Sequence, residues 1–233
     1  VHKQPDLPDH CSMSYDAIAT LRKELFIFKG KHFWRPESSD TKAVEIHQFW
    51  SGLPSNLSHV DAVYENSEGQ ILFFVHQKLY IFEYRTLEKE IPYARIGLGA
   101  NVTSVDMVFK FPHNKIVYLF SGENYWRYDE RFNAVLQPRR EIRKAFKDVY
   151  DTDTAYAVGK TLYFFKGLYH YEFDVRTMNL NRMKPFVSAS VFMKCEELPR
   201  QPPKAEETII EISNRFGSDA PEEPIDTLID DGK

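Results

Sequence analysis

The side chains most able to do chemistry in this sequence are its histidines, and their spacing matches no common catalytic motif. The sequence has no zinc-binding His-Glu-x-x-His segment, no Gly-x-Ser-x-Gly turn, no phosphate-binding glycine loop and no Cys-x-x-Cys pair. The eight histidines are His2, His10, His32, His47, His59, His76, His113 and His170. We therefore expect neither catalysis nor zinc binding from this chain.

Four aspartates, in contrast, recur at a regular spacing. Each opens a short apolar segment: Asp16-Ala17-Ile18, Asp61-Ala62-Val63, Asp106-Met107-Val108 and Asp153-Thr154-Ala155. An aromatic run, a turn and a second aromatic run follow each opening. Steps of 46, 46 and 45 residues separate the phenylalanines of the first runs, which are Phe28, Phe74, Phe120 and Phe165. A fixed period of this size is typical of repeat architectures.

The segments that must position these residues read as short strands. Runs such as Ile71–Val75 are β-branched or aromatic and end at turn residues. Gly30, Gly122 and Gly167 follow three of the runs, and glycine supplies the positive φ that a tight hairpin needs. His76 takes this place in the second repeat, which predicts a longer or differently shaped turn there.

Three to four strands in about 46 residues make one blade of a β-propeller. We therefore predict an all-β, four-bladed β-propeller with blades at about 12–57, 58–102, 103–149 and 150–195, its repeated aromatic side chains filling the space between blades. Residues 1–10 contain two prolines and are expected to be the end of a linker. Residues 196–233 carry a net charge of −7 and five prolines, which predicts a disordered acidic stem.

The two cysteines, Cys11 and Cys195, bracket the four repeats. If the repeats close into a ring, both lie at its seam, where a disulfide would tie the first blade to the last. The alternative is two separate free thiols, which the bracketing disfavours. A disulfide predicts an oxidising compartment.

Two N-glycosylation sequons agree with that compartment. They are Asn56-Leu57-Ser58 and Asn101-Val102-Thr103, each placed just before a repeat, where a surface loop is expected. The sequence shows no signal peptide and no apolar run near the ~20 residues of a membrane span. We expect the chain to be a piece of a larger protein of the secretory pathway.

The charge of the repeats argues against nucleic acid as a partner. Residues 1–195 carry a net charge of only +3, whereas binding to phosphates needs a dense basic face. A basic cluster is a candidate for binding a sulfated glycan, although a solvated helix face is the simpler explanation. The cluster consists of Arg139, Arg140, Arg143, Lys144 and Lys147.

Together, the Asp-Ala openings, the Phe-Phe-x-Gly turn, the segment Tyr125-Trp126-Arg127-Tyr128 and the bracketing cysteines resemble hemopexin-like repeats over residues 11–195. One domain with four blades and one disulfide is most similar to the C-terminal domain of a matrix metalloproteinase. The tail, with Glu206-Glu207 before Thr208-Ile209-Ile210, is similar to the stem of membrane-type members, which leads to a transmembrane or lipid anchor. Met107, Thr154 and His76 depart from the family pattern.

This resemblance implies calcium in the central channel, held by backbone carbonyls of each opening Asp and of the residue two positions later. Those residues are Asp16, Ile18, Asp61, Val63, Asp106, Val108, Asp153 and Ala155. The two-residue step fits a strand, in which alternate residues point the same way. The alternative is that the Asp side chains only cap neighbouring backbone groups and that the channel holds water.

The resemblance also implies a function. It predicts a non-catalytic recognition domain of a cell-surface zinc-dependent matrix metalloproteinase, which binds extracellular-matrix proteins such as collagen, binds metalloproteinase inhibitors and forms homodimers. The membrane would be reached only through a C-terminal anchor that this sequence lacks, and a secreted protein is the alternative location. The alternative functions are a hemopexin-type transport protein that binds haem, and an adhesive matrix protein.

Overall fold

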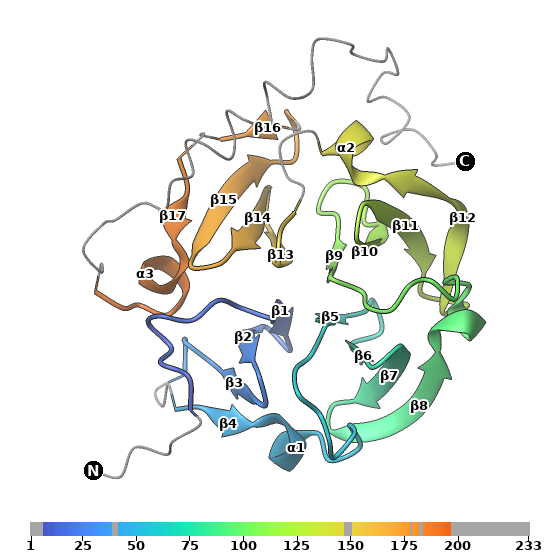
Figure 1. The fold of residues 1–233 in the computed structure, drawn as a ribbon, viewed down its shortest axis with the longest axis horizontal. Helices are drawn as coiled ribbons and strands as arrows, with labels where there is room; N and C mark the ends of the chain where they lie inside the picture. The colour runs from blue at the N-terminus through green and yellow to red at the C-terminus, as the bar shows by residue number, and fades with distance from the viewer. Residues whose placement is uncertain (1–6, 39–41, 147–150, 178, 182–183, 197–233) are drawn as a thin grey trace. The chain divides into compact units, whose positions relative to one another are not determined.

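The computed structural model describes residues 7–38, 42–146, 151–177, 179–181 and 184–196. The predicted linker (1–10) lies mostly outside these residues, and the predicted stem (196–233) does so almost entirely. The described strands form four antiparallel sheets, which follow one another around a central axis (Figure 1). The prediction of an all-β, four-bladed propeller is confirmed.

The first two blades each contain four strands in chain order, so that neighbours in sequence are neighbours in the sheet. Blade one consists of β1 (Ala17–Leu21), β2 (Glu24–Lys29), β3 (His32–Trp34) and β4 (Val44–Glu45), followed by helix α1 (Ile46–Phe49). Blade two consists of β5 (Ala62–Glu65), β6 (Ile71–Val75), β7 (Lys78–Glu83) and β8 (Thr86–Pro92), followed by the 3-10 turn Tyr93–Ile96.

The other two blades repeat this order. Blade three consists of β9 (Met107–Lys110), β10 (Val117–Ser121), β11 (Asn124–Asp129) and β12 (Ala134–Glu141), with helix α2 (Ile142–Ala145). Blade four consists of β13 (Thr154–Val158), β14 (Thr161–Lys166), β15 (Tyr169–Asp174), β16 (Asn179–Leu180) and β17 (Phe186–Val187), with helix α3 (Ser188–Phe192). Strand β17 also pairs with β15 and so makes this the one five-stranded sheet among the described residues.

The core consists of four apolar clusters, each between two neighbouring blades. Successive residues of a strand point to opposite faces, so a middle strand fills two clusters at once. In β6, Phe73 packs toward blade one, whereas Phe74 packs toward blade three. In β14, Phe164 and Phe165 divide in the same way between the clusters on either side of blade four. The repeated aromatic side chains are therefore the packing between blades, as predicted.

The hairpin after the second strand has two residues in every blade, but its shape differs in blade two. Gly30, Gly122 and Gly167 take the first loop position with φ of 56° each. In blade two, His76 and Gln77 form the loop between Val75 and Lys78, and both have positive φ, at 50° and 61°. Positive φ at both positions is the type I′ pattern. The predicted difference in shape is confirmed, and the alternative of a longer turn is wrong.

Candidate functional site

The innermost strands β1, β5, β9 and β13 surround the ring axis (Figure 1). Each begins directly after its opening aspartate, and each aspartate donates its backbone N–H to a phenylalanine carbonyl on the second strand. The four N···O distances are 2.9 Å for Asp16 to Phe28, 3.1 Å for Asp61 to Phe74, 2.8 Å for Asp106 to Phe120 and 2.7 Å for Asp153 to Phe165. The four blades thus present the same backbone arrangement at the axis.

This register fixes the direction of the carbonyls along each inner strand. The Phe28 carbonyl points toward β1, and Phe28 lies opposite Ala17 in the sheet. The backbone groups of Ala17 therefore bond within the blade. Backbone groups alternate in direction along a strand, so those of the next residue, Ile18, point to the free edge that borders the axis. The same argument places the carbonyls of Val63, Val108 and Ala155 at that edge. Sequence analysis predicted these four residues as carbonyl ligands.

The carboxylates of the opening aspartates have another role. Asp16 Oδ2 accepts the N–H of the hairpin glycine Gly30 at 2.7 Å, Asp106 Oδ2 accepts that of Gly122 at 2.6 Å, and Asp153 Oδ2 accepts that of Gly167 at 2.7 Å. In three blades the aspartate therefore caps the turn between the second and third strands. This capping is the alternative role that the sequence left open for the side chains.

Asp106→Ala should therefore lower the free energy of unfolding by about 1–2 kcal/mol, because the Gly122 N–H loses its charged acceptor. Asp106→Asn keeps an acceptor oxygen and should recover most of this loss. Urea unfolding followed by tryptophan fluorescence measures both variants. Equal stability of Asp106→Ala and the unmodified chain would contradict the capping role.

In blade two the opening aspartate contacts a histidine instead. Asp61 Oδ1 lies 3.0 Å from His59 Nε2, and His59 Nδ1 lies 2.9 Å from the Ser58 hydroxyl. Burial raises the pKa of the Asp61 carboxyl, the charges of His59 and His76 act in the opposite direction, and that of Asp106 raises it further. His76 thus occupies the turn position of glycine and also adds a titratable group near Asp61.

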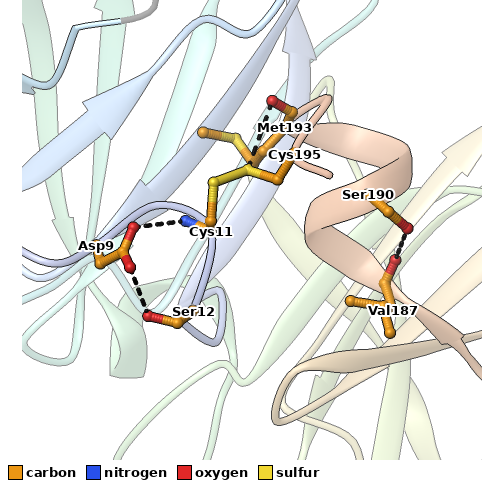
Figure 2. Close-up of a disulfide and its surroundings, with 7 residues drawn as sticks. All are labelled: Asp9, Cys11, Ser12, Val187, Ser190, Met193 and Cys195. Atoms are coloured by element: carbon orange, nitrogen blue, oxygen red, sulfur yellow. Dashed lines mark hydrogen bonds between the residues drawn. A yellow bond between two sulfur atoms is a disulfide. The ribbon is translucent and has the colours of Figure 1, made fainter. Parts of the chain in front are cut away.

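The seam of the ring joins blades one and four. Cys11 and Cys195 form a disulfide with a Cα–Cα distance of 5.7 Å (Figure 2). The Asp9 carboxylate orders the segment beside the disulfide, because it accepts the Cys11 N–H at 3.1 Å and the Ser12 hydroxyl at 3.0 Å. The predicted pairing is confirmed.

A further contact closes the seam near the axis. The hydroxyls of Thr20 in β1 and Tyr156 in β13 lie 2.7 Å apart. Sequence reasoning missed this bond because no local pattern links residues 136 positions apart.

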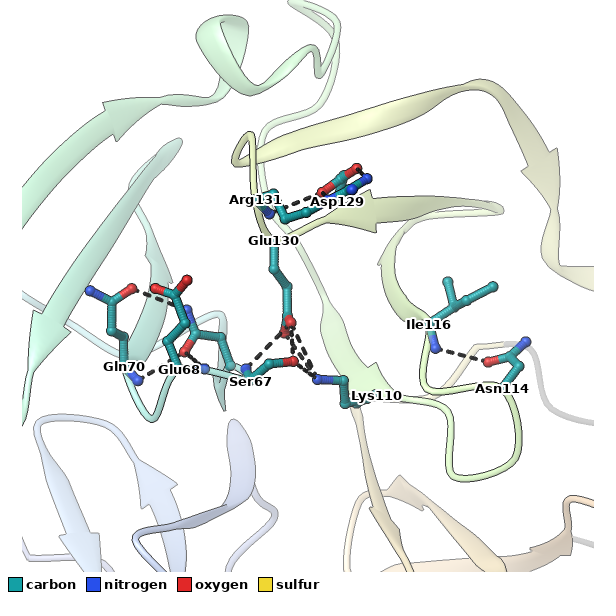
Figure 3. Close-up of polar contacts among 10 residues, drawn as sticks. Ser67, Glu68, Gln70, Lys110, Asn114, Ile116, Asp129, Glu130 and Arg131 are labelled. Carbon is teal, nitrogen blue, oxygen red and sulfur yellow. Dashed lines mark hydrogen bonds and ion pairs between the residues drawn. The ribbon is translucent and has the colours of Figure 1, made fainter. Parts of the chain in front are cut away.

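The junction of blades two and three carries a polar cluster, which sequence reasoning also missed (Figure 3). Ser67, from the turn between β5 and β6, bonds to Glu130, and Lys110 in β9 bonds to both of them. The Lys110 Nζ to Glu130 Oε2 distance is 3.2 Å. The three residues lie far apart in sequence, and only the register of both blades brings them together.

The turns after β11 and β15 contain the same salt bridge, between an aspartate and the arginine two residues later. Asp174 contacts Arg176 at 3.1 Å, and Asp129 contacts Arg131 at 2.7 Å. Hydrogen bonds from the Arg176 side chain and backbone lower the pKa of the Asp174 carboxyl to about 2.

Arg176→Ala should therefore raise the pKa of Asp174 toward the ordinary aspartate range of about 3.9. Because the pKa of Asp174 is depressed in the folded state, this salt bridge stabilises the fold at pH values above the pKa of the unfolded chain. The contribution is lost as the pH falls toward 2. An NMR titration of the Asp174 carboxyl carbon measures the shift, and Arg131→Ala should leave it unchanged. An Asp174 pKa unaffected by Arg176→Ala would rule out this salt bridge as the cause of the lowered pKa.

The predicted basic cluster is partly neutralised. Arg143 contacts Glu123 at 3.2 Å and Lys144 contacts Glu141 at 3.5 Å, while Lys147 lies outside the described residues. The cluster therefore presents less excess positive charge than the sequence suggests. This weakens the case for binding a sulfated glycan.

The described histidines and cysteines do not form a metal centre of their own. Only His10, Cys11 and Cys195 come close enough together, and the two sulfurs are consumed by the disulfide. His170 lies in the core of blade four, stacked on Phe186 with ring centroids 5.3 Å apart. Within the described part of the chain, no helix has the length and apolar character needed to cross a membrane.

Both sequons lie on the surface. Asn56 and Asn101 are exposed, in the connections that lead into β5 and β9. Sequence analysis placed both in such loops. Their occupancy remains a prediction.

Comparison with known proteins finds relatives of this chain. No protein-family model matches the sequence. The chain is 39% identical over 196 residues to matrix metalloproteinase-2 of Drosophila melanogaster, which covers 81% of this chain and 26% of that protein. It is 40% identical over 130 residues to human matrix metalloproteinase-25, covering 53% of this chain and 23% of that protein. The chain thus spans about a quarter of the length of these curated relatives.

Solved structures agree on the fold. A hemopexin fold protein from cow pea superposes with a TM-score of 0.63 at 17% identity, over 78% of this chain and 97% of that one. A 2S albumin seed protein from Dolichos gives a TM-score of 0.62 at 16% identity, over 76% of this chain and 95% of that one. At such identities the likeness concerns the fold alone. Taken with the curated relatives, the four blades and the seam disulfide make this chain a hemopexin-like domain homologous to part of the matrix metalloproteinases.

Proposed function

We propose that this chain is the non-catalytic recognition domain of a zinc-dependent matrix metalloproteinase, and that it binds extracellular-matrix proteins such as collagen as well as metalloproteinase inhibitor proteins. The observation that carries the proposal is the closed ring. The repeated residues are consumed by packing between blades, and the disulfide fixes the ends. Such a rigid ring presents broad surfaces that lose little conformational entropy on binding.

Calcium at the axis belongs to the same proposal. The carbonyls of Ile18, Val63, Val108 and Ala155 point to the inner edges of their strands, so four neutral oxygens from equivalent positions are available to a hard cation. The carbonyls of the opening aspartates would complete the predicted ligand set. Bound calcium would hold the four inner strands together. A calcium-dependent rise in melting temperature, reversed by chelator, tests this part.

Self-association is supported by exposed apolar side chains on blade four. Leu168, in the hairpin after β14, and Val191, in α3, are 38% and 48% exposed. Their segments are adjacent, because Ser188 donates its N–H to the Leu168 carbonyl. Sedimentation of the chain against the double variant Leu168→Ser, Val191→Ser tests this part. A monomer at all concentrations would exclude the homodimer.

The proposed location is extracellular, at the surface of a cell. The seam disulfide supports an oxidising environment. The similarity of residues 206–212 to a membrane-type stem supports attachment through an anchor beyond the tail. Those residues lie outside the described ones, and secretion remains the alternative.

Pull-down with immobilised chain tests the central part of the proposal. We expect saturable capture of fibrillar collagen and of an inhibitor protein by the folded chain, and no capture by chain that has been reduced and unfolded. Failure of the folded chain to retain either protein would overturn the proposed function.

A further inference from the structure

We propose that Asn56 and Asn101 both carry N-linked glycans, and that the two glycans cover one face of the ring on either side of blade two. This face, the entry face, is the one at which β1, β5, β9 and β13 begin. The opposite face, where these inner strands end, is then left to matrix proteins such as collagen.

The two sequons share one local structure. In each, the Asn and the Ser or Thr are exposed, whereas the residue between them is buried: Leu57 is 3% exposed and Val102 is 6% exposed. The N–H of Leu57 bonds to the Pro54 carbonyl and that of Val102 to the Gly99 carbonyl, at 3.0 Å each. A turn anchored by its central apolar side chain therefore leaves both acceptor residues exposed.

The two sites are also equivalent in the fold. Asn56 lies five residues before Asp61, and Asn101 lies five residues before Asp106. Each belongs to a connection that runs inward to the first strand of the next blade (Figure 1). Both glycans therefore project from the entry face, one in the connection that leads into blade two and one in the connection that leaves it.

The seam disulfide supports modification at these sites. It indicates an oxidising compartment, and N-linked glycans are found on surface loops of secreted proteins. Loops that are solvent-exposed in the folded ring also accommodate a bulky, hydrated glycan without disturbing the clusters between blades.

Intact mass of the chain secreted by eukaryotic cells tests the modification. We expect two glycans, removed together by an amidase specific for N-glycans. Asn56→Gln and Asn101→Gln should each lose one glycan, and the double variant should lose both. A secreted chain with the unmodified mass, or with one glycan only, would overturn the proposal.

Oriented capture tests the assignment of the faces, a step that rests on the proposed collagen binding. Chain held by its natural glycans on a mannose-binding lectin should bind collagen within about twofold of the free chain. The control carries Asn56→Gln, Asn101→Gln and G159N, which moves the acceptor to the turn after β13, on the opposite face. Gly159 has φ of +60° and open space around it, and asparagine tolerates this conformation.

The control, held by the lectin at this new position, should lose at least tenfold in collagen binding. Equal binding in both orientations, or a loss only for the natural glycans, would overturn the assignment of the faces. If the free chain binds no collagen, the proposed function fails, whereas the masses still decide the glycan sites.

Discussion

Replacing Cys11 and Cys195 together by serine should lower the free energy of unfolding by about 2–5 kcal/mol. The disulfide spans 184 residues, and a loop of this length gives an entropic upper bound of about 5 kcal/mol. Without it, blades one and four still share the apolar cluster between them and the bond between Thr20 and Tyr156. The melting temperature should fall by about 5–15 °C.

Reductant provides the matched control for this prediction. It should lower the melting temperature of the unmodified chain to that of the double serine variant, and it should leave the variant unchanged. A melting temperature insensitive to reductant would show that the seam disulfide contributes nothing to stability.

The second large effect is expected at Trp50, where Trp50→Ala should lower the free energy of unfolding by about 3–5 kcal/mol. This side chain is fully buried between blades one and two. Its ring packs against Phe73 of blade two at 4.9 Å and against Phe33 of blade one at 5.2 Å between centroids. Truncation would leave a cavity between the blades. It would also leave the Tyr84 carbonyl without the indole N–H, which lies 2.9 Å away.

Phe132→Ala is the control for this aromatic truncation, because Phe132 is 75% exposed. It should change the stability by less than about 0.5 kcal/mol. Chemical unfolding of the two variants under one condition measures the difference. Comparable losses would mean that burial between blades does not distinguish the aromatic side chains.

The period of the aromatic runs was sufficient to predict four blades, since each blade must repeat the same packing against its neighbours. The seam followed from the positions of Cys11 and Cys195, because only a closed ring brings the two ends together. Glycine marked three hairpins for a local reason, the positive φ that they require.

Other features depend on the register of strands in three dimensions and could not be predicted from sequence. The Asp106 carboxylate reaches Gly122 because β9 and β10 pair with Met107 opposite Phe120. The contact of Ser67 with Glu130 needs two blades at once. A recurring Asp placed 14 to 16 residues before a Gly was the available signal for the caps.

The most direct test of the central claim, that closure of the ring makes the binding surface, is the collagen-binding isotherm of the unmodified chain beside that of the variant with both cysteines replaced. The measurement belongs at a temperature at which circular dichroism shows both chains folded. We expect saturable binding by the closed ring and an affinity at least tenfold weaker for the variant. Equal affinities, or no binding by the closed ring, would contradict it.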